Sequence, residues 1–255
     1  MKYVCLFCIV FILTNCATQN DTDLLSDETL KLRNILVAHR GFWDENVNLQ
    51  NTTQAIRDTK FLGIWGSEID IWETEDNYLV LSHDRIFHGI DLRANNFIEI
   101  NKHLSEFGIN IPTLEDALEE VMDSGNNLLI EIKHAQTQTL KKVIASYPEL
   151  NDKIIFMSFN SSICESLIEN GIKPVCLLLS TPEIDIDKLA EIGYNGIAID
   201  AGALLHRPDL IDKCKTKGMT TFVWTVNNGK LARDFAYLNV DLIISDIPNF
   251  ILSMR

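Results

Sequence analysis

The hydrophobic pattern beyond residue 30 alternates between short apolar runs and longer amphipathic stretches up to the C-terminus. The apolar runs are rich in β-branched residues and nearly continuous, which is typical of parallel strands covered on both faces. Eight of these runs are predicted strands: Ile35–His39, Ser67–Ile71, Leu128–Ile132, Ile154–Ser158, Val175–Leu179, Gly196–Ile199, Thr220–Thr225 and Leu242–Ser245. Repeated strand–helix units in this number predict an α/β fold, a (β/α)8 barrel of the TIM type, more than an open doubly wound sheet.

The stretches between the predicted strands contain residues that begin and end helices. Thr113–Asp116 and Ser162–Glu165 both fit the capping-box pattern, in which a carboxylate answers a hydroxyl three residues earlier. Gly171, Gly193 and Gly218 each lie where a helix is expected to end before the next strand. The sequence has neither the glycine-rich dinucleotide fingerprint nor a Walker loop, which argues against an open-sheet nucleotide binder.

Two segments interrupt the repeating pattern. Tyr78–His83 is strand-like and follows a plausible turn at Asp76 and Asn77, so we expect a hairpin at the mouth of the barrel after the second strand. Arg85–Ile111 has weak periodicity and predicts a loop insertion above the barrel.

The first residues predict a targeting segment. The uninterrupted apolar run Tyr3–Leu13 is too short to span a bilayer and suits the core of a signal peptide. Leu13–Cys16 resembles a bacterial lipobox, in which the cysteine becomes the lipidated N-terminus, although Asn15 replaces the usual small residue.

This pattern divides the chain into three parts. We expect a signal segment at residues 1–16, a polar tether at 17–30 and one barrel domain at 31–255. The organisation predicts export to the bacterial cell envelope or periplasm, as a lipoprotein in contact with a membrane through an anchor at Cys16.

The net charge and the spacing of the cysteines exclude nucleic-acid binding, and a zinc knuckle or disulfide framework, respectively. The formal net charge is −14 and there is no basic tail, so a nucleic-acid backbone would be repelled and nucleic acid is excluded as a partner. The cysteines of the barrel domain are too widely spaced for a zinc knuckle or a disulfide framework, and are predicted to be buried small apolar residues: Cys164, Cys176 and Cys214.

Charged residues gather at the carboxyl ends of the predicted strands, where barrel enzymes have their active sites. Glu68 and Asp70 point to one face of the second strand, because side chains alternate along a strand. Such a pair repels unless a cation lies between the carboxylates, and Ca²⁺ or Mg²⁺ prefers oxygen ligands. Glu131 and Lys133 repeat this spacing on the third strand. Each residue alone could be a surface or salt-bridged group, but the whole set on an apolar framework favours a functional site.

Two histidines lie near this set. His39 ends the first strand, followed by Arg40, and His83 follows the predicted hairpin strand. An isolated histidine at the position of His83 would more often be structural or exposed, but a pair of histidines beside a metal can divide the roles of acid and base. The other histidines have no comparable neighbours and are interpreted as non-catalytic: His88, His103, His134 and His206.

Short motifs occur in a fixed order over nearly all of the chain beyond residue 35: His39–Gly41, Asn51–Thr52, Gly66–Asp70, Thr74–Asp76, His83–Asp84, Ile111–Glu115, Ile130–Lys133, Ser158–Asn160, Trp224–Asn227 and Ser245–Pro248. In these motifs and their order the sequence resembles the glycerophosphodiester phosphodiesterase family. The resemblance implies metal-dependent hydrolysis of a small phosphodiester, giving glycerol phosphate and an alcohol in phospholipid breakdown. It also implies a cyclic phosphate intermediate, formed by a hydroxyl of the glycerol and then opened by water.

The resemblance implies a role for each candidate residue. Three carboxylates would hold one divalent cation, Ca²⁺ or Mg²⁺: Glu68, Asp70 and Glu131. The acid–base pair would be the two histidines His39 and His83. Phosphate oxygens would be bound by Arg40 and Lys133, a fork and a point charge respectively. Trp224 would line the pocket, with an aromatic of the barrel core as the competing interpretation.

One departure from the family pattern lies at Gln50, where the family usually has a glutamate before the asparagine. The missing charge could weaken metal binding, or Gln50 could serve as a neutral hydrogen-bond partner of Arg40 or of the substrate.

Two alternative functions stay open. One is a barrel phospholipase acting on intact phosphatidylinositol or sphingolipid head groups. The other is a lipid-anchored binding protein without turnover, for which Gln50 is the support.

Overall fold

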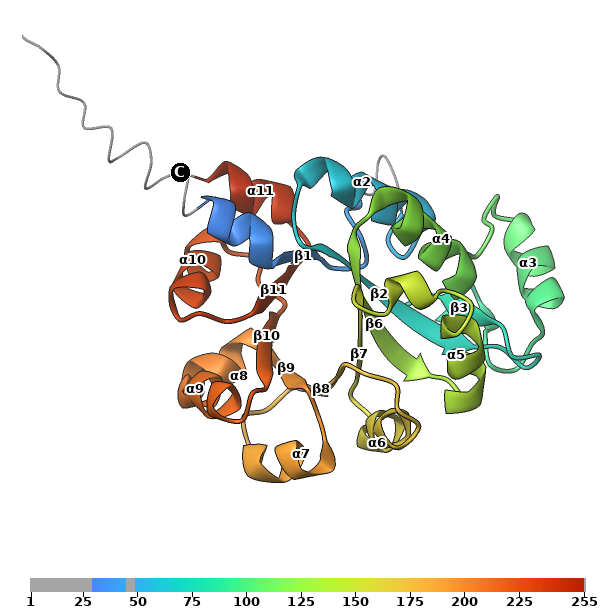
Figure 1. Ribbon diagram of the computed structural model, residues 1–255. Helices are drawn as coiled ribbons and strands as arrows, with labels where there is room; N and C mark the ends of the chain where they lie inside the picture. Colours follow the sequence, from blue (N-terminus) through green and yellow to red (C-terminus); the bar gives the residue numbers. More distant parts are fainter. Residues whose placement is uncertain (1–28, 45–48, 255) are drawn as a thin grey trace, which may run out of the picture.

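Eight parallel strands form a closed barrel in the computed structural model, which confirms the predicted fold (Figure 1). The model describes residues 29–44 and 49–254, so the predicted signal segment and nearly all of the tether lie outside the described residues. The barrel strands are β1 Leu36–Ala38, β2 Gly66–Glu73, β6 Asn127–His134, β7 Ile154–Ser158, β8 Val175–Leu179, β9 Gly196–Asp200, β10 Thr220–Trp224 and β11 Leu242–Ser245. The sheet closes because β1 pairs in parallel with both β2 and β11.

Helices surround the strands on the outside of the barrel (Figure 1). They are α2 Thr53–Leu62, α4 Leu114–Ser124, α5 Thr137–Ile144, α6 Ser161–Glu169, α7 Ile186–Ile192, α8 Ala201–His206, α9 Asp209–Thr216, α10 Gly229–Tyr237 and α11 Pro248–Ser253, with a 3₁₀ turn at Pro148–Leu150 and further helical residues at 29–35. The predicted capping box of α4 is present at Thr113 and Asp116. The one predicted for α6 is wrong, because Asn160 caps that helix by accepting from the Ser162 amide.

The core has two main parts. Alternate strand residues fill the inside of the barrel: Val37, Leu129, Met157, Cys176, Leu178, Ala198, Phe222, Leu242 and Ile244. The other face of each strand packs against the surrounding helices in a larger cluster. The barrel cysteines are all free and buried, as predicted, and burial raises the pKa of the Cys176 thiol to about 12.

The predicted hairpin and insertion follow β2. Strand β3, Leu79–Leu81, runs antiparallel to β2, which confirms the hairpin. The prediction of a loop for the next segment is wrong, because it contains two short paired strands, β4 Ile86–Phe87 and β5 Ile90–Asp91, and helix α3, Phe97–Ser105. These elements have a small core of their own: Val80, Ile90, Leu92, Ile100, Leu104 and Ile111.

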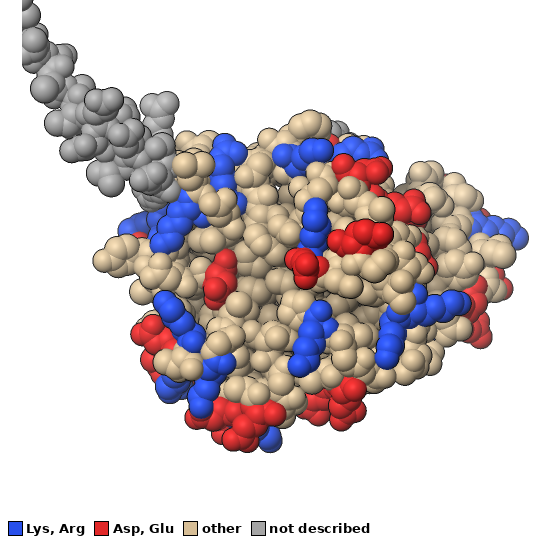
Figure 2. Space-filling view, in the orientation of Figure 1, with Lys and Arg blue, Asp and Glu red and all other residues tan. Residues whose placement is uncertain are grey.

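The surface carries charges of both signs. On the face shown in Figure 2, lysines and arginines are interspersed with acidic residues, and residues of both signs also lie near the centre of the face. Among the described residues, none of the helices has the length and apolar character needed to cross a membrane.

Candidate active site

Three buried carboxylates meet at the carboxyl end of neighbouring strands β2 and β6. Asp70 is the register partner of Glu131 across the two strands, and Glu68 lies two residues earlier on the same face of β2. Their exposed fractions are 1% for Glu68, 0% for Asp70 and 7% for Glu131. One oxygen from each carboxylate lies within 4.8 Å of the others. Strand alternation and strand pairing therefore build the predicted acidic triad.

The electrostatics of this triad fit a divalent cation. Burial, together with repulsion from Asp70 and Glu131, raises the pKa of the Glu68 carboxyl well above its usual range. Burial and repulsion from Asp70 raise the pKa of Glu131 to about 7. The Glu68 Oε1 atom is buried and has no hydrogen-bond partner among the described residues. A buried, orphaned carboxylate oxygen among like charges is the environment that a hard cation with oxygen ligands relieves.

Lys133 neutralises part of this charge. Its Nζ lies 2.6 Å from Glu131 Oε1 and 3.0 Å from Asp70 Oδ1. Burial works to lower the pKa of the Lys133 ammonium, but the attraction of both carboxylates outweighs burial and raises that pKa. The group therefore remains a cation beside the triad.

The segment after β1 fixes the orientation of the two β2 carboxylates. Asn51 holds Asp70 twice, since its side-chain amide donates to Asp70 Oδ2 at 2.9 Å and its carbonyl accepts from the Asp70 amide at 3.0 Å. The Arg40 amide donates to Glu68 Oε2 at 2.9 Å. Gly41 permits this tight turn, because it has φ +81° and an added Cβ would lie 2.6 Å from the Ala55 Cβ. The His39–Gly41 and Asn51–Thr52 motifs therefore contain residues that position the two β2 carboxylates.

His39 directly follows β1 and pairs with a residue that directly follows β11. Its Nδ1 lies 2.5 Å from Asp246 Oδ1. The hydrogen bond from His39 holds the pKa of the Asp246 carboxyl below its usual range, so this carboxylate accepts and the Nδ1–H donates. Asn227 donates to Asp246 Oδ2 at 2.6 Å and fixes the carboxylate from the other side. The His39 Nε2 consequently faces Glu68 Oε2, at 3.9 Å.

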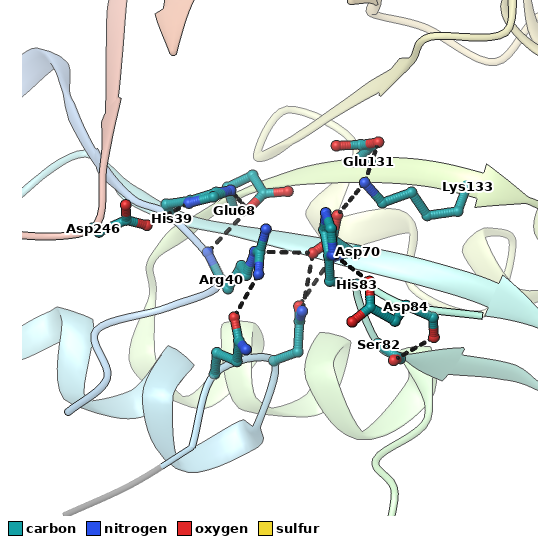
Figure 3. Close-up of polar contacts among 12 residues, drawn as sticks. His39, Arg40, Glu68, Asp70, Ser82, His83, Asp84, Glu131, Lys133 and Asp246 are labelled. Atoms are coloured by element: carbon teal, nitrogen blue, oxygen red, sulfur yellow. Dashed lines mark hydrogen bonds and ion pairs between the residues drawn. The ribbon is translucent and has the colours of Figure 1, made fainter. Parts of the chain in front are cut away.

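His83 has its own carboxylate partner. Its Nδ1 lies 2.8 Å from Asp84 Oδ1, and both side chains are more exposed than the His39 pair. The backbone here is tied to β2, because the Ser82 amide donates to the Asp70 carbonyl at 3.1 Å. Figure 3 shows the two histidine–aspartate pairs on opposite sides of Arg40 in that view.

Arg40 extends across the mouth of the site. Its guanidinium donates to Gln50 Oε1 at 2.7 Å, so one of the interpretations considered for Gln50, a neutral partner of Arg40, matches the geometry. The Arg40 Nε lies 3.6 Å from Asp70 Oδ2. The two cationic groups of Arg40 and Lys133 therefore both border the triad.

One cavity of about 130 Å³ at the barrel mouth is lined by six of the predicted site residues together with Trp224 and Phe159: His39, Arg40, Glu68, His83, Glu131 and Lys133. The Trp224 Nε1 donates to the Ala198 carbonyl at 3.0 Å, and its ring meets Phe159 edge-on with centroids 5.5 Å apart. Trp224 also packs against the inner barrel cluster, so it lines the pocket and contributes to the core at the same time.

The structure brings together all of the site residues predicted from sequence, while their chemical roles stay predictions. The neighbours that were missed include Asp246, Asn227 and Phe159. All three belong to motifs that the sequence shows, but their contacts cross between strands or loops far apart in the chain. Sequence spacing alone gives no sign of such a contact.

A closed parallel barrel with three buried carboxylates, two histidines and two cationic side chains at its mouth is suited to metal-assisted hydrolysis of an anionic ester, such as a phosphoric diester. Comparison with known proteins agrees. The model of the glycerophosphoryl diester phosphodiesterase family matches residues 39–250. A glycerophosphodiester phosphodiesterase of Caldanaerobacter subterraneus subsp. tengcongensis is 26% identical over 249 residues, covering 88% of this chain and 98% of the relative.

Solved structures show the same barrel. A glycerophosphodiester phosphodiesterase from Parabacteroides distasonis has 27% identity and a TM-score of 0.76, covering 86% of this chain and 95% of that one. An Oleispira antarctica phosphodiesterase, solved in complex with the product sn-glycerol-3-phosphate, has 21% identity and a TM-score of 0.71, covering 88% and 98% of the two chains. The chain belongs to the glycerophosphodiester phosphodiesterase family and is a phosphoric diester hydrolase.

Proposed function

We propose that this enzyme hydrolyses glycerophosphodiesters to glycerol phosphate and an alcohol with one divalent cation, Ca²⁺ or Mg²⁺, held by Glu68, Asp70 and Glu131. The observation that carries the proposal is the buried triad, with ligand oxygens within 4.8 Å of one another, placed beside two histidines in one cavity. The product named for the Oleispira enzyme belongs to the same chemical class. When bound, the cation would supply Lewis acidity, which lowers the pKa of a coordinated hydroxyl and stabilises charge on phosphoryl oxygens.

Arg40 and Lys133 bind the phosphate in this proposal. The Arg40 guanidinium and the Lys133 ammonium border the triad, so both favour a diester anion. Positive groups fixed before the reaction stabilise the additional charge that develops on phosphoryl oxygens in the transition state.

The two histidines move the protons. Asp246 accepts from Nδ1 of His39, so the neutral imidazole carries its free lone pair on Nε2, toward the cavity. Asp84 places His83 in the same tautomer. One imidazole can therefore accept the proton of the attacking hydroxyl while the other, protonated, donates to the departing alcohol. Reversal of these roles opens a cyclic phosphate with water.

An activity assay with a matched pair of variants tests the proposal. Purified enzyme is treated with chelator, and release of glycerol phosphate and alcohol is measured before and after Ca²⁺ or Mg²⁺ is added. We expect turnover to depend on the cation, and Asp70→Asn to abolish it while thermal melts show an intact fold. Asp123→Asn, an exposed carboxylate on α4, serves as the control and should retain wild-type turnover.

The alternatives give different results in the same assay. Hydrolysis of intact phosphatidylinositol or sphingolipid in preference to glycerophosphodiesters would identify a phospholipase. Tight binding of glycerophosphodiesters without turnover at any cation concentration would identify a binding protein and overturn the proposal.

We also propose that the enzyme is exported and anchored in a membrane through a lipid on Cys16. The support is the apolar run followed by the Leu13–Cys16 pattern. Mass spectrometry of the N-terminal peptide from a membrane extract tests this. An unmodified mature N-terminus beyond Cys16 would contradict it.

A further inference from the structure

A second hollow lies beside the active-site cavity, between the insertion and the loop that follows β1. The greater part of its surface is apolar, and polar residues complete the lining. It is lined by Leu49, Gln50, Asn51, Thr52, Leu81, Ser82, His83, Asp84, Phe87, Ile109, Asn110, Ile111 and Pro112. Leu81 and Ile111 are buried, whereas Leu49 is 51% exposed and forms part of the rim. We refer to this hollow, defined by these residues, as the apolar groove.

The apolar groove and the active-site cavity share one lining residue, His83, which lies between them. Gln50, in the groove wall, is hydrogen-bonded to the Arg40 guanidinium, which lies in the cavity wall. A diester bound with its phosphate beside Arg40 therefore has two directions in which its arms can extend, one into the cavity and one past His83 into the groove.

The two hollows differ in charge, and the two arms of a glycerophosphodiester differ in polarity. The cavity contains Glu68, Glu131 and Lys133, which can hydrogen-bond the free hydroxyls of a glycerol arm. The groove lining has one acidic residue, Asp84, and its other polar side chains stand among aliphatic and aromatic ones. Building on the proposed function, we propose that the apolar groove binds the alcohol arm of the diester and selects alcohols that carry an aliphatic chain next to the ester oxygen.

The negative charge of the groove lining adds a second preference among alcohols. Asp84, with 74% of its side chain exposed, lines the groove, and the described lining contains no lysine or arginine. An alcohol that bears a carboxylate would meet like charge there without a cation to pair with. The groove therefore favours neutral aliphatic alcohols over anionic ones of the same length.

A series of glycerophospho-n-alkyl diesters of increasing chain length tests the proposal in the metal-loaded enzyme. The acidity of the leaving alcohol is nearly constant along such a series, so changes in kcat/KM report binding in the groove. We expect a gain of up to about fourfold for each methylene buried, until the groove is filled. Diesters of ω-carboxyalkyl alcohols should gain less than their neutral counterparts.

Amino-acid substitutions test whether the alcohol chain binds in the groove and not elsewhere on the insertion. Leu49→Ser and Ile109→Ser should each remove most of the gain in kcat/KM per methylene. Because Leu49 is exposed, its variant is expected to fold and stays informative even if the Ile109 variant unfolds. Ile98→Ser is the matched control, since Ile98 is 77% exposed on α3 and lies outside the groove lining, and it should keep the wild-type gain. No gain with chain length in the wild type, or an unchanged gain in the folded groove variants, would overturn the proposal. Absence of turnover for the methyl diester would instead contradict the proposed function.

Discussion

Removal of the divalent cation should make the folded state less stable as pH rises from acidic to neutral. In the metal-free protein the pKa of Glu131 is raised from 4.5 to about 7, and that of Glu68 is raised in the same direction. When folding raises the pKa of a carboxyl, that group stabilises the folded state fully at pH values below its pKa in the unfolded chain. This stabilisation is lost as the pH rises through the pKa that the group has in the folded state. The loss therefore falls between about pH 4.5 and about pH 7.

The size of the effect follows from the same shift. For Glu131, which is 7% exposed, a rise from 4.5 to about 7 corresponds to about 3 kcal/mol of stability lost across the interval. In a domain of this size that is a fall in Tm of roughly 6–12 °C. His134 acts in the opposite sense, because burial lowers the pKa of its imidazole and the folded state gains stability as that group deprotonates.

Thermal unfolding in chelator across this pH interval measures the effect, with saturating Ca²⁺ or Mg²⁺ as the comparison. The cation favours the charged carboxylates, so the stability it adds should grow with pH. Glu131→Gln should flatten the pH dependence of the metal-free protein. The difference from wild type reports Glu131 and the part of the Glu68 shift that Glu131 causes, because His134 is present in both. A metal-free stability that stays constant or rises over the interval would refute the reasoning, as would a slope unchanged by Glu131→Gln.

Three further outcomes concern the proposed chemistry. His39→Ala and His83→Ala should each slow the chemical step by roughly 10²–10⁴-fold in single-turnover kinetics, and a nitrophenyl diester should rescue only the variant that has lost the general acid. Asp246→Asn, which weakens the hold on His39 Nδ1, should lower kcat by less than His39→Ala and change the pH–rate profile while KM is nearly constant. Gln50→Glu keeps an acceptor for Arg40 and adds negative charge, so it should lower the cation concentration needed for half-maximal activity.

The sequence was sufficient to predict the barrel and the triad because both follow from local pattern. Continuous apolar runs mark strands buried on both faces, and three of the predicted strands have the same bounds in the structure: Ile154–Ser158, Val175–Leu179 and Leu242–Ser245. Glu68 and Asp70 share a face by strand alternation alone. The closeness of Glu131 depends in addition on the pairing of β2 with β6, which neighbouring strands in a barrel make predictable.

The insertion was harder to predict, for a physical reason. Helix α3 buries only Ile100 and Leu104, and Ile98 beside them is 77% exposed, so the hydrophobic period of the segment is blurred. The signal that was overlooked is the capping box formed by Asn96 and Glu99. His39 and Asp246 were a different problem, since their contact depends on the closure of the barrel.

The bond between His39 and Asp246 links residues that directly follow the first and the last strands of the barrel. During synthesis β1 and its histidine leave the ribosome long before β11, and the carboxyl triad is complete well before either Asp246 or the pairing of β1 with β11 exists. The three carboxylates of the triad are therefore all synthesised before the residue that orients His39. Full turnover then requires closure of the ring of strands, because only closure brings Asp246 to His39.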